Sequence, residues 1–100
     1  MDGITQYHTA ITAMLHKIME SQREPIGRAA RRLADAIQED RYIYVIGTGG
    51  HSYIACEEMF WRAGGLVPIY PILDPGFSVS HGAWRSMLVE RTPGYVIPIL

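Results

Sequence analysis

Residues 42–65 read YIYVIGTGGHSYIACEEMFWRAGG, and this stretch decides how the chain folds. The run from 41 to 46 is short, β-branched, aromatic and apolar at nearly every position, which is typical of a strand covered by helices on both faces. A glycine cluster follows at 47–52. Apolar residues then recur at a helical period from His51 to Ala63, and Gly64 and Gly65 supply a stop. The stretch therefore predicts a strand, a glycine turn and a helix.

A second strand is expected at 66–72, which reads LVPIYPI. Its two prolines cannot donate ladder hydrogen bonds, so this strand lies at an edge or is irregular after Val67. Together the two strands and the helix between them predict a βαβ unit with parallel strands. Asp74-Pro75-Gly76 marks a turn, and Ser80 is placed to cap a helix that runs to about Glu90.

Two helices are expected before the first strand. An apolar stripe at spacings of three and four predicts a helix from about 3 to 20 and consists of Ile4, Tyr7, Ile11, Met14 and Ile18. Residues 21–24, SQRE, have the form of a capping box, and Pro25 follows where a new helix can begin but an old one can hardly continue. The second helix is therefore expected to run from there to about Asp40.

The chain of 100 residues has the size of one small domain. We expect residues 1–100 to form a single, incomplete α/β domain, with 1–40 as a helical pair and 41–100 as the first βαβ unit. Two parallel strands are too few for a stable sheet, since sheets usually have about four to six strands. The missing strands would be truncated or supplied by another chain.

Composition excludes several function classes. Nine Lys and Arg against ten Asp and Glu leave a formal net charge of -1, so no strong field attracts nucleic acid or a membrane surface. The single cysteine, Cys56, falls on the apolar side of its helix and is expected to be a buried thiol, with no disulfide and no zinc site. No signal peptide or transmembrane run is recognisable, so a cytoplasmic location is expected.

The glycine cluster suits an anion. At the carboxyl end of a parallel strand, the next helix presents free N–H groups and the positive end of its dipole. Glycines at 47, 49 and 50 let the backbone approach an anion closely, and Thr48, His51 and Ser52 add side-chain donors. Phosphate is the natural ligand. The alternative is a glycine turn that only connects strand to helix.

Two common phosphate motifs are excluded. A Walker loop needs Gly-Lys-Ser/Thr, and this loop has no lysine. The dinucleotide fingerprint needs a glycine where Ser52 stands and an acidic residue about 20 positions later. Neither ATP nor NAD is supported, and no cofactor is expected; a hydroxyl-rich loop favours a small phosphate monoester.

The stretch YVIGTGGHSYIACEEMFWRAGGLVPIYPIL resembles the first strand, phosphate loop and helix of the sugar isomerase (SIS) domain. It is similar to the branch known only as phosphosugar-binding SIS proteins, and the later SHGAWRS and ERTPGY match that branch in order and spacing. The resemblance implies a parallel sheet in a three-layer αβα sandwich of flavodoxin-like type, and dimers or tetramers. It also implies a phosphorylated sugar or amino sugar as ligand.

Carried over by position, the residues of the first phosphate loop are Gly47, Thr48, Gly49, His51 and Ser52. Gly50 is an insertion relative to the usual GTGHS, so either His51 or Ser52 takes the usual donor place. A second, Ser/Thr-rich loop that completes the site in the family has no counterpart here.

Aldose–ketose isomerisation needs a carboxylate base and often a histidine for ring opening, and it needs no metal. The candidates are Glu57 and Glu58, in the helix after the loop, and His81, which follows the second strand. Each also has an ordinary alternative: Glu58 precedes Arg62 by four residues, the spacing of a surface ion pair, and His81 can cap a helix.

The sequence thus predicts phosphosugar binding through GTGGHS, with isomerisation as a possible reaction. A non-catalytic phosphosugar sensor and an inactive fragment that only oligomerises are the alternatives.

Overall fold

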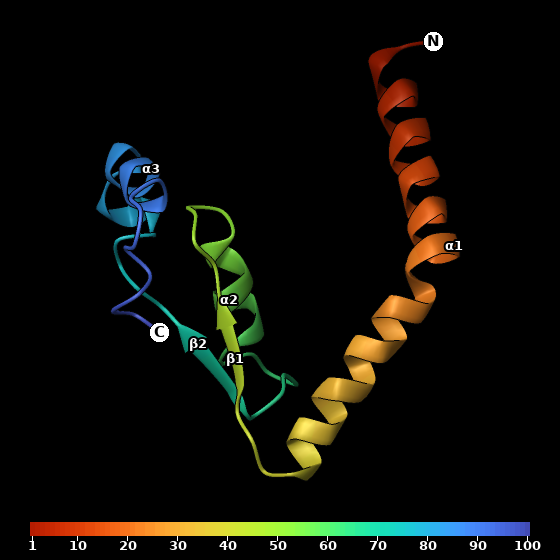
Figure 1. Cartoon of the computed structure of the whole chain (residues 1–100). Helices are drawn as coiled ribbons and strands as arrows, with labels where there is room; N and C mark the ends of the chain where they lie inside the picture. Colours follow the sequence, from red (N-terminus) through yellow and green to blue (C-terminus); the bar gives the residue numbers. More distant parts are fainter. The chain divides into compact units, whose positions relative to one another are not determined.

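The computed structural model describes residues 1–100, which form two compact units, Met1–Gln38 and Glu39–Leu100. The first unit is a single helix, α1 (Gly3–Gln38). The second contains two strands, two α-helices and a short 3-10 helix (Figure 1).

Helix α1 corrects the prediction of two helices before the first strand, because it runs through Pro25 without interruption. A proline inside a helix removes one backbone hydrogen bond and its ring presses on the carbonyl four residues earlier, here that of Ser21. The helix responds by bending in its middle rather than by ending (Figure 1). SQRE at 21–24 therefore lies inside a helix, and the Ser21 hydroxyl donates to the Lys17 carbonyl at 2.7 Å.

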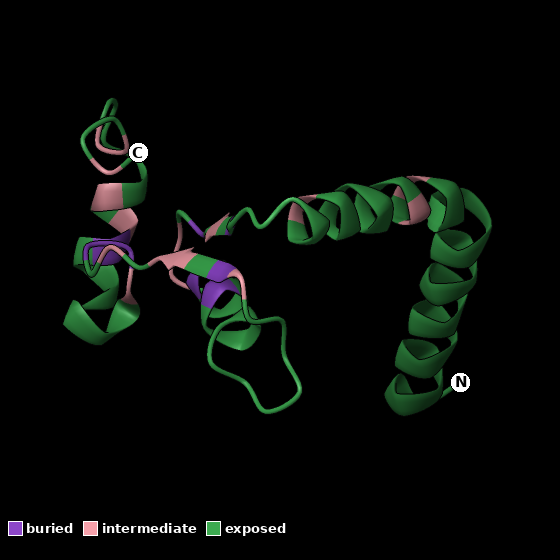
Figure 2. Ribbon diagram, turned by 90° about the horizontal axis from the view of Figure 1, so that it is seen from below, coloured by how far each residue is buried: buried purple, intermediate pink, exposed green.

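No residue of α1 is buried (Figure 2). The predicted apolar stripe is present on the helix but exposed, from Ile4 at 84% to Ile11 at 36%. Helix α1 is therefore held by its own backbone hydrogen bonds and by local pairs such as Arg28 with Glu24.

The two strands are β1 (Ile43–Ile46) and β2 (Ile69–Ile72), and they pair in parallel. Ile43 pairs with Ile69 and Ile46 with Ile72, so the predicted parallel βαβ unit is confirmed. Pro71 lies within β2 opposite Val45, which a two-stranded sheet tolerates because each strand is an edge. Both strands are shorter than predicted at their first residues.

Within this unit helix α2 (Tyr53–Met59) covers one face of the sheet. It packs on both strands, over the buried Ile43 and Ile69. The exposed rings of Tyr42, Tyr44 and Tyr70 contact one another, with centroids 5.3 to 6.5 Å apart. The three-layer sandwich that the resemblance implies stays a prediction.

Helix α2 is shorter than the predicted 51–63. It is preceded by a turn and ends at Met59, because Phe60 is extended and Trp61 has a φ of 56°. After β2, a 3-10 helix η1 (Val79–His81) precedes α3 (Ala83–Glu90). Ser80 does not cap α3; instead the Ser78 hydroxyl accepts a hydrogen bond from the Ser80 N–H at 3.2 Å, and Gly82 with a φ of 107° separates the two helices.

Candidate functional site

Residues 47–52 connect the end of β1 to the start of α2. Gly47 is buried, and a Cβ there would overlap backbone atoms of Ser52 and Tyr53. The backbone of the turn closes directly over Gly47, so this position requires the smallest residue. The sequence places a glycine where the fold leaves no room for a side chain.

Ser52 closes the loop on itself. Its Oγ accepts a hydrogen bond from the Gly49 N–H at 2.9 Å and donates to the Gly49 carbonyl at 3.1 Å. The Tyr53 N–H donates to the same carbonyl at 2.9 Å. The Ser52 hydroxyl is thus engaged in holding the turn, whereas the ring of the exposed His51 has no hydrogen-bond partner in the chain.

Three consecutive backbone N–H groups in the loop are unpaired. Those of Gly50, His51 and Ser52 donate to no acceptor in the chain, while the next ones are used, since Ile54 donates to His51 and Ala55 to Ser52. Successive free N–H groups form a concave donor surface for an anion. Helix α2 has only seven residues, so direct hydrogen bonds rather than the helix dipole would provide most of the attraction.

Residues later in the chain, from η1 and α3, lie against the loop. A Cβ at Gly50 would lie 2.5 Å from Cγ1 of Val79 and 3.4 Å from Oγ of Ser86. A Cβ at Gly49 would lie 2.8 Å from Oε2 of Glu90. The second and third glycines of GTGGHS therefore make room for η1 and α3.

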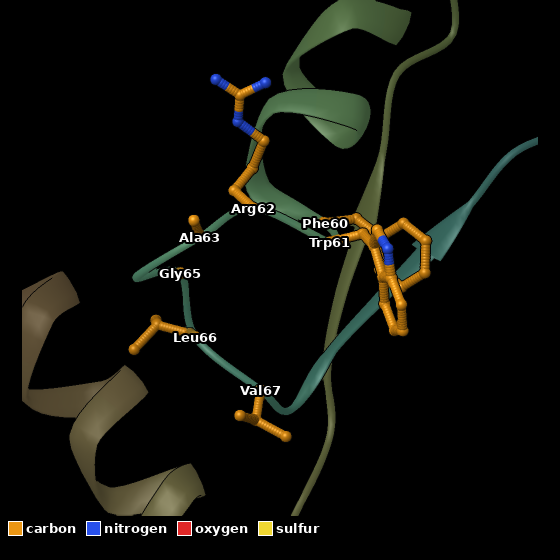
Figure 3. Close-up of a pocket in the computed structure, with 7 residues that line it drawn as sticks. All are labelled: Phe60, Trp61, Arg62, Ala63, Gly65, Leu66 and Val67. Carbon is orange, nitrogen blue, oxygen red and sulfur yellow. The ribbon is translucent and has the colours of Figure 1, made fainter.

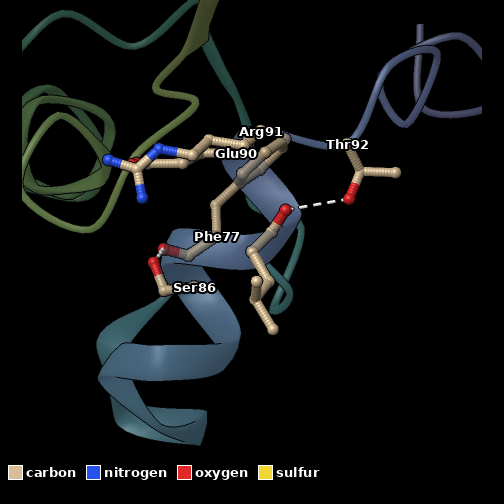
Figure 4. Close-up of polar contacts among 6 residues, drawn as sticks. Phe77, Ser86, Glu90, Arg91 and Thr92 are labelled. Carbon is tan, nitrogen blue, oxygen red and sulfur yellow. Dashed lines mark hydrogen bonds and ion pairs between the residues drawn. The ribbon is translucent and has the colours of Figure 1, made fainter.

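Helix α3 is fixed by a buried hydroxyl. Ser86, which is 2% exposed, donates to the carbonyl of the buried Phe77 at 2.8 Å (Figure 4). The Phe77 ring packs edge to face on Tyr95, with centroids 5.4 Å apart. Phe77, in the segment after β2, thus contacts helix α3 through Ser86 and the C-terminal turns through Tyr95.

Asp74 anchors the same region to the end of β2. Its Oδ1 accepts hydrogen bonds from the Gly76 N–H at 2.8 Å and from the Tyr95 hydroxyl at 2.9 Å. Donating to a carboxylate raises the pKa of the Tyr95 hydroxyl, because losing that proton would place two negative charges together. The predicted turn at 74–76 is thereby tied to residue 95.

A cavity of about 200 Å³ lies between the loop and these C-terminal elements. The residues that line it come from the loop, from the end of α3 and from the turns that follow: Thr48, Phe77, Val89, Glu90, Thr92, Gly94, Tyr95 and Val96. Among these residues, Thr48 belongs to GTGGHS and Glu90 lies next to it. This cavity is the candidate ligand site next to the loop.

The predicted catalytic residues do not line this cavity. Glu57 and Glu58 are exposed on α2, and Glu58 pairs with Arg62 at 3.6 Å, as its helical spacing indicates. His81 is exposed at the end of η1. The carboxylate that does approach the loop is Glu90, which sequence reasoning missed because no local pattern relates the last residue of α3 to Gly49.

Two buried titratable groups lie behind the loop on α2. Cys56 is fully buried, as predicted, and burial raises the pKa of its thiol. Burial also raises the pKa of Tyr53, the first residue of α2. Both are therefore neutral core groups at neutral pH rather than nucleophiles.

A larger cavity, of about 350 Å³, lies in the connection between α2 and β2 (Figure 3). It is lined by Phe60, Trp61, Arg62, Ala63, Gly65, Leu66 and Val67. This connection leads to the amino end of β2, whereas the GTGGHS loop follows the carboxyl end of β1. None of the predicted site residues lies in it.

Neither a metal site nor a membrane span is found. No group of three or more His, Cys, Asp and Glu residues is arranged to hold a metal ion. No helix is both long enough and apolar enough to cross a bilayer.

The chain is similar to several curated proteins of the UPF0309 group. It is 39% identical to a UPF0309 protein of Halalkalibacterium halodurans over 92% of this chain and 36% of that protein. It is 40% identical to one of Geobacillus sp. (strain WCH70) over 88% of this chain and 35% of that protein, and 38% identical to one of Brucella anthropi over 95% and 39%. The chain thus spans little more than a third of these relatives.

The resemblance seen in the loop is confirmed at the level of the family. The sequence profile of the SIS domain matches residues 6–100, which include most of α1, the βαβ unit and the C-terminal helix α3. This chain belongs to the SIS domain family.

Proposed function

We propose that this chain binds a phosphorylated sugar or amino sugar, with the phosphate at residues 47–52. The observation that carries the proposal is the set of three consecutive unpaired N–H groups at Gly50, His51 and Ser52, beside the unpaired ring of His51. Together these groups supply at least four donors at the carboxyl end of β1, where an anion is stabilised without any lysine. Membership of the SIS family supports a sugar phosphate over other anions.

Within this proposal, His51 takes the side-chain donor place that the extra glycine leaves open. The Ser52 hydroxyl already donates to Gly49, so it holds the loop, and the unpaired backbone N–H of Ser52 is left for the phosphate. Gly47 lets the backbone close, Gly49 makes room for the Glu90 carboxylate, and Thr48 lines the adjoining cavity.

The test is thermal unfolding against a ligand panel. The panel contains fructose 6-phosphate, glucosamine 6-phosphate, ribose 5-phosphate and sedoheptulose 7-phosphate, with the unphosphorylated sugars and inorganic phosphate as controls. A ligand that binds only the folded state adds about 2.7 kcal/mol to the unfolding free energy at a hundred times its Kd. A rise in Tm with phosphosugars alone is expected, and no rise with any phosphate would refute the proposal.

Substitutions in the loop locate the site. The double variant His51→Ala with Ser52→Ala should abolish phosphosugar binding while the far-UV circular dichroism stays that of the parent. His51→Ala alone is expected to weaken binding about tenfold, because it removes the side-chain donor but leaves the three backbone N–H groups in place. Unchanged affinity in the double variant would exclude the loop as the site.

Aldose–ketose isomerisation of the bound sugar is the catalytic extension of this proposal, with Glu57, Glu58 and His81 as its predicted acid–base groups. The test of isomerisation is whether the protein converts a sugar phosphate of the panel without added metal, with the conversion monitored by NMR. A sensor would bind the same sugar with no conversion.

We also propose assembly into dimers or tetramers, which the exposed apolar stripe of α1 supports. Sedimentation over a range of protein concentrations tests this assembly.

A further inference from the structure

The side chain of Glu90 adjoins the proposed phosphate loop from the end of helix α3. Its Oε2 would lie 2.8 Å from a Cβ at Gly49, so only the absence of a side chain at position 49 allows the carboxylate to approach this closely. Glu90 also lines the cavity of about 200 Å³ together with Thr48 of the loop. The carboxylate thus stands next to the anion-binding turn, on the side of the cavity.

This carboxylate has no hydrogen-bond donor in the chain. Its one charged neighbour is Arg91, whose Nη2 lies 3.9 Å from Oε1, beyond hydrogen-bonding distance. The two side chains leave the end of α3 on the same side (Figure 4). The Glu90 side chain is 32% exposed and that of Arg91 is 65% exposed, so the arginine is solvated and the lone pairs of the carboxylate remain available.

The position of Glu90 is fixed by hydrogen bonds made on both sides of it along the chain. Helix α3 is anchored by Ser86 to the carbonyl of Phe77, and its last turn is closed by the Thr92 hydroxyl, which donates to the Leu88 carbonyl at 2.8 Å (Figure 4). The backbone of Glu90 therefore lies between two hydrogen-bonded residues, Ser86 and Thr92.

A carboxylate beside an anion site has a defined effect on selectivity. It repels a bare phosphate, because two like charges a few ångströms apart disfavour each other. It attracts a ligand that carries hydroxyl or ammonium groups next to its phosphate, because these donate charge-assisted hydrogen bonds to it. A sugar phosphate carries both a phosphate, which the carboxylate repels, and hydroxyl groups, which it attracts. Inorganic phosphate and simple phosphate esters carry only the phosphate.

We propose that Glu90 is the specificity-determining residue of this site: it accepts hydrogen bonds from the sugar hydroxyl or amino groups and selects polyhydroxylated phosphate monoesters over other phosphates. The inference rests on the proposed function, and it adds to it the group that recognises the sugar half.

The experiment compares two phosphate monoesters, the sugar phosphate of the panel with the largest Tm rise and methyl phosphate, which carries the same phosphate group but no sugar hydroxyl or amino group. Their dissociation constants are measured by isothermal titration calorimetry for the parent and for Glu90→Gln. The matched control is Glu39→Gln, which removes the same charge from an exposed pair with Arg41 before the start of β1, at the other end of the strand from the loop.

In Glu90→Gln, methyl phosphate should bind about threefold to tenfold more tightly, because a like charge is removed. The sugar phosphate should lose its charge-assisted bonds, so that its preference over methyl phosphate falls about tenfold or more. Glu39→Gln should leave both constants within about twofold of the parent. Glu90→Asp, which keeps the charge but draws it back by one methylene, should give an intermediate preference.

Each outcome is decisive. A parent that binds the sugar phosphate, with a preference unchanged within about twofold in Glu90→Gln, overturns the role of Glu90 and leaves the proposed function standing. An equal fall in Glu39→Gln assigns the effect to net charge and also overturns it. A parent that binds no phosphate overturns both the site and this inference.

Discussion

Helix α1 and the unit from Glu39 to Leu100 obtain their structures from different sources. In α1 every backbone hydrogen bond is local and no residue is buried. In the second unit the strands have four residues each and the α-helices seven and eight, lengths that are marginal in isolation. Their stability comes from contacts between distant residues, such as that of Tyr95 with Asp74. The same substitution should therefore have different consequences in the two regions.

The largest contrast is expected between two glycines. Gly47→Ala should cost about 3 kcal/mol of unfolding free energy and abolish ligand binding, because its Cβ meets backbone atoms of Ser52 and Tyr53 that cannot move aside. Gly27→Ala in α1 should instead stabilise the helix by roughly 0.5 to 1 kcal/mol, since its Cβ meets only the Arg31 guanidinium at 3.6 Å. Urea denaturation of both variants measures the difference.

A Gly47→Ala variant as stable as the parent would show that the loop is not built around that position. Gly49→Ala serves as the internal control, because its Cβ meets only side-chain atoms, the movable end of Glu90 at 2.8 Å and the Ser52 hydroxyl at 3.4 Å. It should cost less than Gly47→Ala while it displaces the carboxylate.

Two serines offer a contrast of intermediate size. Both hydroxyls donate to a backbone carbonyl, Ser86 to Phe77 at 2.8 Å and Ser21 to Lys17 at 2.7 Å. Ser86→Ala should cost about 1 to 3 kcal/mol, because it leaves a buried carbonyl without a donor. Ser21→Ala should cost nothing or stabilise slightly, since that carbonyl is exposed and alanine favours the helix.

Chemical denaturation again measures both changes. Equal costs for the two serines would contradict the view that burial distinguishes the two regions. Loss of phosphosugar affinity in Ser86→Ala, with α1 unaffected, would further show that α3 supports the site.

The smallest effect is a pH dependence that belongs to the second unit. Burial raises the pKa of Cys56 above its ordinary value of 9.0, so above about pH 9 the unfolded chain loses this proton first. The folded protein then binds more protons than the unfolded one, and the free energy of unfolding falls as the pH rises through that range, by at most about 1.4 kcal/mol per pH unit. Below about pH 9 this contribution is fully present.

Cys56→Ala should flatten the decline that begins near pH 9 and leave the part that Tyr53 adds from its ordinary value of 10.0 upward. Denaturant midpoints between pH 7 and 10.5 measure the slope. An unchanged slope in Cys56→Ala would mean that the thiol ionises equally well in the folded state.

Several features of the fold were predictable from local patterns. The alternation of an apolar strand, GTGGHS, a helical period and a second apolar strand predicted the parallel pairing that Ile43 and Ile69 show. The apolar stripe of α1 and the burial of Cys56 followed from helical periodicity. The break expected at Pro25 was wrong, because a proline costs one hydrogen bond and a bend, which a helix of 36 residues accommodates.

For the site, the sequence alone determined the loop: glycines where the backbone closes on itself, and donors at the carboxyl end of a strand. The structure of the loop decided how the donors divide, because the Ser52 hydroxyl is engaged by Gly49 three residues earlier while the ring of His51 has no partner. Only the tertiary structure brought Glu90 to Gly49, across some forty residues of chain. Local periodicity specifies which face of an element is apolar, but the approach of two elements depends on packing between distant residues, which no local pattern records.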